Sequence, residues 1–357
     1  MADFAFMKVY KITEDRYIVT DGTNVWEANE ATASAIDKGK ATKIKRFILI
    51  AEKYYKSVQE LSQHGIDTDY ADPEKLEYII DQEVIKVDDK EYSFSVSKHD
   101  AGSTVVFIKS GYSKPELAFL YEELVKLGVL VINSPEAVKN TSNKWITYQL
   151  LEKHNIMQPV SVLVSSHDIS KKDHSMMEKK LKSIYRNPSD DDKYVCKILH
   201  GHGGRGVFVC RHKNILSILQ AIFAINADEL VLVQKKIDIK DGDMRFNILT
   251  IGGKQQLINA VRRTGSSSDF RTNLSLGGHA EEFEPEARVK KLAFEVAKIS
   301  GLTWAGVDII EDQDGNLFVI EVNGAPGTPY DVDDQEELLR KNTEFYNRLT
   351  KMIGDMI

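Results

Sequence analysis

Cysteine is scarce in this sequence, whose 357 residues include only Cys196 and Cys210. Two thiols cannot build a disulfide framework or a cysteine-based zinc site, and such sparing use fits a reducing compartment. The two cysteines lie symmetrically about Gly203, so a strand, loop and strand that fold back at this glycine would bring the thiols together. We predict two reduced, packed thiols, with a redox switch as the alternative.

Long hydrophobic runs are also missing. The strongest apolar run, residues 47–51, has the length of a strand and is far too short to cross a bilayer. Met1-Ala2-Asp3 does not begin a signal peptide, so we expect a cytoplasmic protein. A large excess of one charge is lacking as well, because the formal net charge is −7 and acidic and basic residues are well mixed. This mixture argues against nucleic acid or a membrane as the main partner.

The length and the 42% apolar content are enough for more than one domain with its own core. Residues 1–41 predict a compact β-rich N-terminal appendage. Strands and helices alternate in residues 42–133, which predicts an open α/β domain with a parallel sheet. A second unit, residues 134–357, begins at the punctuation Asn133-Ser134-Pro135. The expected fold class is therefore α/β, with α+β lobes in the second unit.

The hydrophobic pattern and the cap signals also predict individual elements. In the first two regions we expect strands at 8–12, 16–20, 25–27, 44–51, 104–109 and 129–132, and helices at 31–37, 52–64 and 115–127. In the second unit we expect a helix capped by Asn143, helices at 214–226 and 286–300, a strand at 230–234, and a terminal helix from Gln335.

Residues 307–323 read as a hairpin that carries oxygen ligands on one face. Asp314-Gly315 is a strong two-residue turn signal between apolar strands. With that turn, Asp308 lies directly opposite Glu321, and Asn323 follows on the same face. Facing carboxylates repel each other, so a divalent cation between them would explain the arrangement, and an all-oxygen set favours Mg²⁺ or Mn²⁺. A solvated hairpin with an acidic wet face is the alternative.

The stretch Gly201-His202-Gly203-Gly204-Arg205-Gly206 formally matches the dinucleotide fingerprint. That fingerprint requires a helix after it, whereas residues 207–210 read as a strand, so a Rossmann site is a weak interpretation. It is not a P-loop, and the chain lacks the His-Arg-Asp and Asp-Phe-Gly sequences of kinases. We predict a glycine loop between antiparallel strands whose backbone amides cover phosphates, with Lys197 on the entering strand as a point charge. A plain glycine-rich hairpin is the alternative.

A second hairpin is predicted around Gly252-Gly253. Its simplest register sets Asp243 across from Arg262. Guanidinium groups suit phosphate and carboxylate oxygens because their planar fork binds two oxygens at once. An ion pair at a strand end is the alternative. Polar side chains suited to phosphate also enter and leave the following loop, namely Arg262, Arg263, Arg271 and Asn273.

The order of these parts resembles the ATP-grasp superfamily, and most of all its RimK-type carboxylate-amine ligases. The resemblance covers about residues 104–330. The segments that carry it are Lys144, Lys197 before the glycine loop, Gln234-Lys235-Lys236-Ile237, Asp243-Met244-Arg245, Arg262-Arg263, Asp269-Phe270-Arg271-Thr272-Asn273-Leu274, Gly277-Gly278, Ala305-Gly306-Val307-Asp308 and Glu321-Val322-Asn323-Gly324-Ala325-Pro326-Gly327.

The resemblance implies an ATP-grasp domain over residues 134–357, with a glycine-loop lobe at about 158–235 and a metal-site lobe at about 236–357. It implies roles for individual side chains as well. ATP would be bound by Lys144, Lys197, Gly203, Gly204, Gln234, Lys235, Lys236, Ile237, Asp243, Arg271 and Asn273. Two Mg²⁺ or Mn²⁺ ions would be held by Asp308, Glu321 and Asn323. Arg262 and Arg263 would be catalytic and stabilise an acyl phosphate. Lys235 stands where the family usually has an acidic residue.

The activity implied is an ATP-dependent ligation of a carboxylate to an amine through an acyl phosphate, with an amino acid, peptide or protein as acceptor. No protein nucleophile is needed, which agrees with the absence of a serine, cysteine or histidine constellation. One alternative is a macrocyclase that forms side-chain amides or esters in a ribosomal peptide. A catalytically inactive ATP-binding regulatory module is an alternative of another class. Family members often pair, so a homo-oligomer is also considered.

Overall fold

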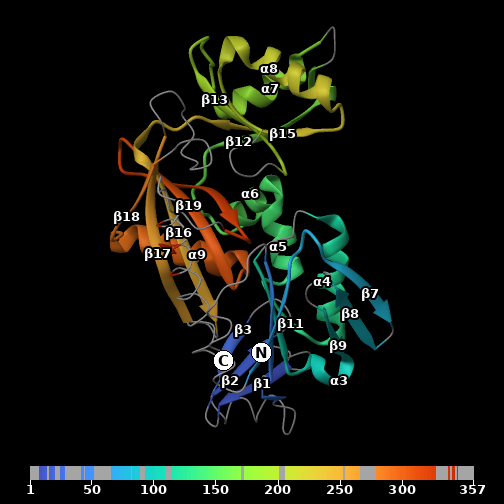
Figure 1. Cartoon of the computed structure of the whole chain (residues 1–357). Helices are drawn as coiled ribbons and strands as arrows, with labels where there is room; N and C mark the ends of the chain where they lie inside the picture. Colours follow the sequence, from blue (N-terminus) through green and yellow to red (C-terminus); the bar gives the residue numbers. More distant parts are fainter. Residues whose placement is uncertain are drawn as a thin grey trace.

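The computed structural model describes most of the chain. The described residues are 8–13, 16–20, 25–28, 42–43, 45–51, 66–81, 83–88, 93–109, 114–169, 173–200, 206–251, 254–265, 279–326, 337, 340, 341 and 344. In Figure 1 the green and yellow elements form an upper lobe, the orange sheet lies below it, and the N-terminal strands lie at the bottom.

The N-terminal region contains a four-stranded sheet with the order β3-β2-β1-β4. β1, β2 and β3 form an antiparallel meander, and β4 joins β1 in parallel. The three strands predicted for this region are confirmed, whereas the helix predicted at 31–37 lies outside the described residues. The strands are β1 (Lys8–Thr13), β2 (Arg16–Thr20), β3 (Val25–Ala28) and β4 (Thr42–Lys43).

The next region holds a parallel sheet with the order β11-β10-β5-β6, as the strand and helix alternation predicted. Its core strand β10 is fully buried, and α4 packs its apolar side chains onto the same cluster. The helix expected at 52–64 lies outside the described residues. The elements are β5 (Arg46–Ile50), β6 (Asp67–Ala71), β10 (Thr104–Ile108), α4 (Pro115–Leu127) and β11 (Leu130–Ile132).

Between β6 and β10 lies an antiparallel sheet that our sequence prediction missed. Its order is β7-β8-β9, followed by the short helix α3. The signal was present, because β8 and β9 alternate buried and exposed side chains with the period of two that a half-buried strand requires. The elements are β7 (Glu77–Asp81), β8 (Val84–Asp88), β9 (Ser93–Ser97) and α3 (Lys98–Ala101).

The upper lobe in Figure 1 is an antiparallel sheet with the order β12-β15-β13-β14, covered by α7 and α8. Cys196 and Cys210 are both buried in its core as free thiols, as predicted. β14 follows the glycine loop, so the requirement for a helix after a dinucleotide fingerprint is not met. The elements are β12 (Ser161–Ser165), η2 (Ser166–Ile169), α7 (Ser175–Ile184), β13 (Lys193–Ile198), β14 (Val207–Arg211), α8 (His212–Ile225) and β15 (Leu230–Lys235).

The orange sheet has the order β18-β17-β16-β19-β20. Helix α9 packs on one face through a large apolar cluster, which leaves the opposite face for polar side chains. The terminal helix expected from Gln335 is helical at its described positions, 337, 340, 341 and 344. The elements are β16 (Ile239–Ile251), β17 (Lys254–Thr264), β18 (His279–Glu282), α9 (Ala287–Ser300), β19 (Trp304–Asp312) and β20 (Leu317–Asn323).

Two helices, α5 (Pro135–Ser142) and α6 (Lys144–Lys153), connect the parallel sheet to the rest of the chain. Ahead of them, the buried side chain of Asn133 joins the two units. Its Nδ2 donates to the carbonyl oxygens of Trp304 and Gly324, and its Oδ1 accepts from the backbone N–H of Trp304. Asn133 therefore fixes the first residue of β19 and the residue directly after β20.

Replacing Asn133 by alanine should lower the free energy of unfolding by about 3 kcal/mol, because backbone groups of Trp304 and Gly324 would be left buried without a partner. Chemical denaturation measures this loss. Asn187→Ala, at an exposed position, is the matched control and should change stability by less than about 0.5 kcal/mol. Equal effects of the two substitutions would contradict the role given to Asn133.

Candidate active site

The acidic hairpin sets Asp308 directly opposite Glu321, as predicted. The predicted two-residue turn is nevertheless wrong. The backbone N–H of Asp312 bonds to the carbonyl of Asn316, and Gly315 has a φ of 83°, which makes a three-residue loop with glycine in the left-handed region. A bulge beside Asp308 and Ile309 then shifts the register back by one residue. Two departures from the simple hairpin therefore cancel at Asp308.

The Asp308 carboxylate is only 2% exposed and is bonded to two arginines. Arg245, on the neighbouring strand β16, donates from Nε to Oδ1 and from Nη2 to Oδ2, the latter at 2.7 Å. Nη2 of Arg263 lies 3.0 Å from Oδ2. Burial alone would raise the pKa of Asp308, but the charges and hydrogen bonds of Arg245 and Arg263 lower it below its ordinary value. Asp308 is thus held as a carboxylate.

The second hairpin has a different register from the one predicted. Asp243 pairs with Arg263, not with Arg262, because the β16–β17 ladder shifts by one residue beside Asn247 and Ile248. The Arg263 guanidinium donates to both Asp243 oxygens, at 2.7 and 2.6 Å. A one-residue shift moves a side chain to the other face of a sheet. Arg263 consequently shares a face with Asp308.

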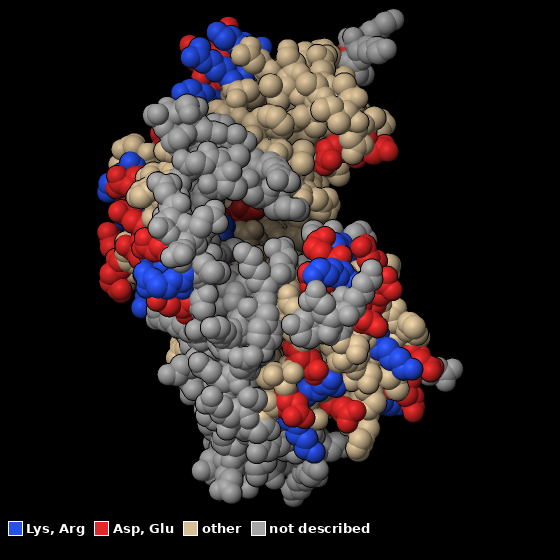
Figure 2. All heavy atoms as spheres, viewed as in Figure 1, with Lys and Arg blue, Asp and Glu red and all other residues tan. Residues whose placement is uncertain are grey.

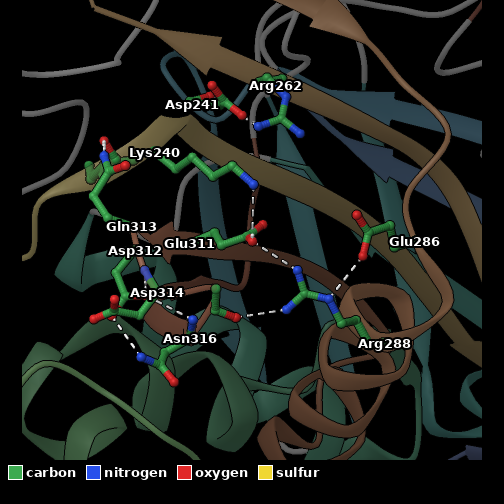
Figure 3. A network of polar contacts seen from close by, with 12 residues as sticks. Lys240, Asp241, Arg262, Glu286, Arg288, Glu311, Asp312, Gln313, Asp314 and Asn316 are labelled. Atoms are coloured by element: carbon green, nitrogen blue, oxygen red, sulfur yellow. Dashed lines mark hydrogen bonds and ion pairs between the residues drawn. The ribbon is translucent and has the colours of Figure 1, made fainter.

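Arg262 lies on the other face. Its cross-strand partner is Met244, which belongs to the core cluster under α9. The guanidinium carbon lies 4.9 Å from the centre of the Phe283 ring, and Nη1 donates to the carbonyl of Asp241 at 3.1 Å. Figure 3 shows Arg262 and Asp241 beside the network in which Arg288 joins Glu286 and Glu311. The catalytic role predicted for Arg262 remains a prediction, whereas Arg263 is the member of the pair that faces Asp308.

Two lysines approach the acidic hairpin from other elements. Lys144 is the first residue of α6, which begins there because the Asn143 side chain caps the helix, and its Nζ lies 3.9 Å from Oε1 of Glu321. Lys197 projects from β13 in the upper lobe. Burial lowers the pKa of Lys197 to about 8, and the repulsion of Lys144 acts in the same direction, against the attraction of Glu321. The backbone N–H of Lys144 donates to the carbonyl of Leu199 at 3.2 Å, so α6 and the upper lobe meet at this point.

A hollow lies beside Lys144, and Figure 2 shows charged atoms inside the recess below the upper lobe. Lys144, Gln234 and Glu321 all line it, so the structure brings together three of the residues predicted to bind ATP or metal. Gln234 is buried, and its Nε2 donates to Oγ of Ser161 at 2.8 Å. The hollow therefore combines cationic, amide and carboxylate groups. Its other lining residues are Thr141, Thr147, Tyr148, Leu151, Gln158, Leu232, Ile320 and Val322.

The remaining predicted ATP-binding residues divide into two groups. Lys235 ends β15 and places Nζ 5.5 Å from the centre of the Tyr185 ring, and Lys236 bonds to Asp238 at 3.4 Å. Ile237 follows them and is half-buried. Gly203, Gly204, Arg271 and Asn273 lie outside the described residues.

The donor set near Asp308 fits a divalent cation in part. The described residues contain no cluster of three or more histidine, cysteine, aspartate or glutamate side chains suited to a metal. Glu321 is one-third exposed, and Nδ2 of Asn323 is a buried atom with no hydrogen-bond partner. Asn323 therefore has unused hydrogen-bonding capacity on the same strand as Glu321. Asp308 already accepts from two arginines, so a cation would have to share its oxygens.

Two residues of this region carried signals that our sequence reasoning did not use. Arg245 alternates with Asp243 along β16 and so had to share its face. Tyr148 lines the hollow, and its ring stacks on Trp145 with the centres 5.3 Å apart. Three residues separate it from Lys144 on the same helix, which sets the two side chains on one side.

A family model described as the RimK-like ATP-grasp domain matches residues 141–335. Among curated proteins, the "Probable alpha-L-glutamate ligase" of Parasynechococcus marenigrum is 34% identical over 202 residues, which are 56% of this chain and 40% of that protein. The "N-acetylaspartylglutamate synthase A" of Homo sapiens is 30% identical over 205 residues, which are 57% and 48% of the two chains. The matched part thus spans about half the length of these relatives.

Two solved structures resemble this chain over most of its length. One is D-alanyl-alanine synthetase A from Vibrio cholerae, with a TM-score of 0.58 and 15% identity over 87% of this chain and 98% of that one. The other is an ATP-grasp ligase associated with ribosomal peptides from Chryseobacterium gregarium, with a TM-score of 0.59 and 12% identity over 88% and 98%. The fold is therefore that of the ATP-grasp ligases, as predicted. None of the described helices is long and apolar enough to cross a membrane.

The lowered pKa of Lys197 predicts a pH-dependent stability. Between about pH 8 and the ordinary value of 10.5, the unfolded chain keeps a proton that the folded chain has lost, so this lysine makes the free energy of unfolding rise with pH. Lys197→Met removes the titrating group. It should stabilise the nucleotide-free protein most below about pH 8, and its advantage should shrink above that pH.

Urea denaturation at about pH 7, 8, 9 and 10 measures the difference between Lys197→Met and wild type. Lys193→Met, at an exposed position on the same strand, is the matched control. An advantage of Lys197→Met that stays constant across this range would show that Lys197 does not titrate as its burial requires.

Proposed function

The chain belongs to the RimK-like ATP-grasp family, and from this premise we propose that it is an ATP-dependent carboxylate-amine ligase. The reaction would join an amino acid to an amino-acid, peptide or protein acceptor through an amide bond. A carboxylate does not condense with an amine in water, because its oxygen is a poor leaving group. Transfer of the γ-phosphoryl group of ATP to the carboxylate would give an acyl phosphate, and the amine would then displace inorganic phosphate.

The residues around the hollow have properties suited to these steps. Lys144 and Lys197 approach from α6 and β13, and both would bind phosphate oxygens of the nucleotide. Gln234 would contact the base from the adjoining wall. Arg263 is fixed by Asp243 and would stabilise the negative charge of the phosphoryl group in flight. In this proposal the two lysines position the nucleotide, and the rigidly held Arg263 stabilises the charge of the transferring group.

Divalent cations would be held by Glu321 and Asn323 together with Asp308, and when bound they would neutralise charge on the transferring phosphoryl group. The observation that carries the proposal is the convergence of Lys144, Gln234 and Glu321, which line one hollow from three elements that are far apart in sequence. A retired nucleotide site would have no reason to keep this set together. An inactive ATP-binding module is for this reason the weaker interpretation.

A second candidate function is the modification of a ribosomal peptide by side-chain amide or ester bonds. The observation that favours it is the likeness to the Chryseobacterium ligase, which was solved with ADP and with a leader and a core peptide. That likeness extends over 88% of this chain, whereas the curated relatives match 56–57% of it. The N-terminal sheets would then be the natural place for a peptide to bind.

The proposal is tested by incubating the full chain with ATP, Mg²⁺ and panels of amino acids and peptides. ADP release would be followed, and the product mass determined. We expect steady release of ADP with one carboxylate and amine pair, and a product heavier than the acceptor by one residue. A peptide that becomes lighter by one water would identify the peptide-modifying alternative. Tight ATP binding without turnover under any pair would favour the inactive module.

Replacing Glu321 by alanine should reduce ATP turnover by about 100-fold or more, because the carboxylate that pairs with Lys144 and would hold a cation would be lost. Initial rates of ADP release measure the effect. Glu295→Ala, at an exposed position on α9, is the matched control and should leave the rate within about twofold. Retention of both ATP binding and turnover in Glu321→Ala would remove the basis of the proposed site.

A further inference from the structure

Four charged side chains form an alternating row across three strands of the orange sheet. Arg263 donates to Asp243 and also contacts Asp308. Arg245 donates to Asp308 from the other side of the row. All four side chains are at most 9% exposed. The row holds two positive and two negative charges, so it is neutral as it stands. Water cannot take the place of any member, because each is buried.

This neutrality affects what Asp308 can bind. A carboxylate has about four acceptor positions, and three of them are used by Nε and Nη2 of Arg245 and by Nη2 of Arg263. A divalent cation at the remaining position would lie within a few ångströms of two guanidinium charges of the same sign. Nothing in the row offers the cation a net negative charge.

Glu321 cannot compensate alone. Its carboxylate lies opposite Asp308, but the nearby Nζ of Lys144 offsets its charge. Lys197 adds a further positive charge from the upper lobe below about pH 8. The charges of these groups and of the neutral row therefore sum to a positive value. A positive site attracts phosphate oxygens and repels free cations.

We propose that Arg245 and Arg263 are positioning residues that occupy Asp308 in the nucleotide-free protein, so that a divalent cation binds there only together with a nucleotide. The triphosphate supplies the missing negative charge and competes for the guanidinium groups, and Asp308 then becomes available. Arg245 blocks the Asp308 oxygens more completely than Arg263 does. Both hydrogen bonds of Arg245 go to Asp308, whereas Arg263 divides its contacts between Asp308 and Asp243. The inference rests on the proposed nucleotide site and adds an order of binding to it.

The experiment measures binding of Mn²⁺ by electron paramagnetic resonance, with no carboxylate or amine substrate present. Wild-type protein alone should leave the added Mn²⁺ free, and the same protein with the analogue AMPPNP should bind it more tightly than AMPPNP alone does. Tight Mn²⁺ binding by the nucleotide-free wild-type protein would overturn the proposal, and this measurement needs no variant.

A gain of binding provides the second measurement. Arg245→Met leaves the row with one net negative charge and should raise the affinity of the nucleotide-free protein for Mn²⁺ by about tenfold or more. Arg245→Lys keeps the charge and should bind Mn²⁺ as weakly as wild type. Arg288→Met, which removes an exposed arginine outside the row, should also bind as wild type does. An Arg245→Met protein that remains folded and gains no Mn²⁺ affinity contradicts the proposal.

Failure of this inference and failure of the proposed function give different results. If calorimetry shows that the wild-type protein does not bind AMPPNP in the presence of Mg²⁺, both the nucleotide site and the proposed function are rejected. Normal AMPPNP binding combined with equal Mn²⁺ affinity in the presence and absence of nucleotide would leave the function intact and reject only the order of binding.

Discussion

Asp308 is a carboxylate almost without access to water, and it remains charged because Arg245 and Arg263 bond to it from neighbouring strands. A buried charge of this kind is tolerated only with well-placed partners, since desolvation would otherwise outweigh its attraction. The polar face of the sheet is arranged around this requirement. Helix α9 fills the opposite face with apolar side chains, so the charged row has a rigid support.

The site is assembled from elements that reach it from different directions. Lys144 begins α6, Lys197 lies in the upper lobe, and Glu321 stands on β20. Burial and the like charge of Lys144 lower the pKa of Lys197 to about 8, against the attraction of Glu321. Asn133 ties the parallel sheet to the backbone just after Asn323. The N-terminal half of the chain is thereby connected to the acidic hairpin.

Local irregularities decide which side chains meet. A bulge in the β16–β17 ladder places Arg263 beside Asp308 and turns Arg262 to the other face, where Figure 3 shows it among surface charges. A three-residue loop and a bulge in the β19–β20 hairpin offset each other, so that Asp308 still faces Glu321. A shift of one residue exchanges the two faces of a strand, and neither bulge has a clear signature in the sequence.

Local pattern by itself determined much of the architecture: the parallel strands around β10, the bounds of α4 and the cap at Asn143. These depend on neighbours in sequence, whose periodicity and turn residues are directly readable. Only the tertiary structure decided that Arg245 bonds to Asp308, because the two residues are 63 positions apart on strands whose pairing no local pattern specifies. The same reason applies to Asn133, whose partners lie 171 and 191 residues away.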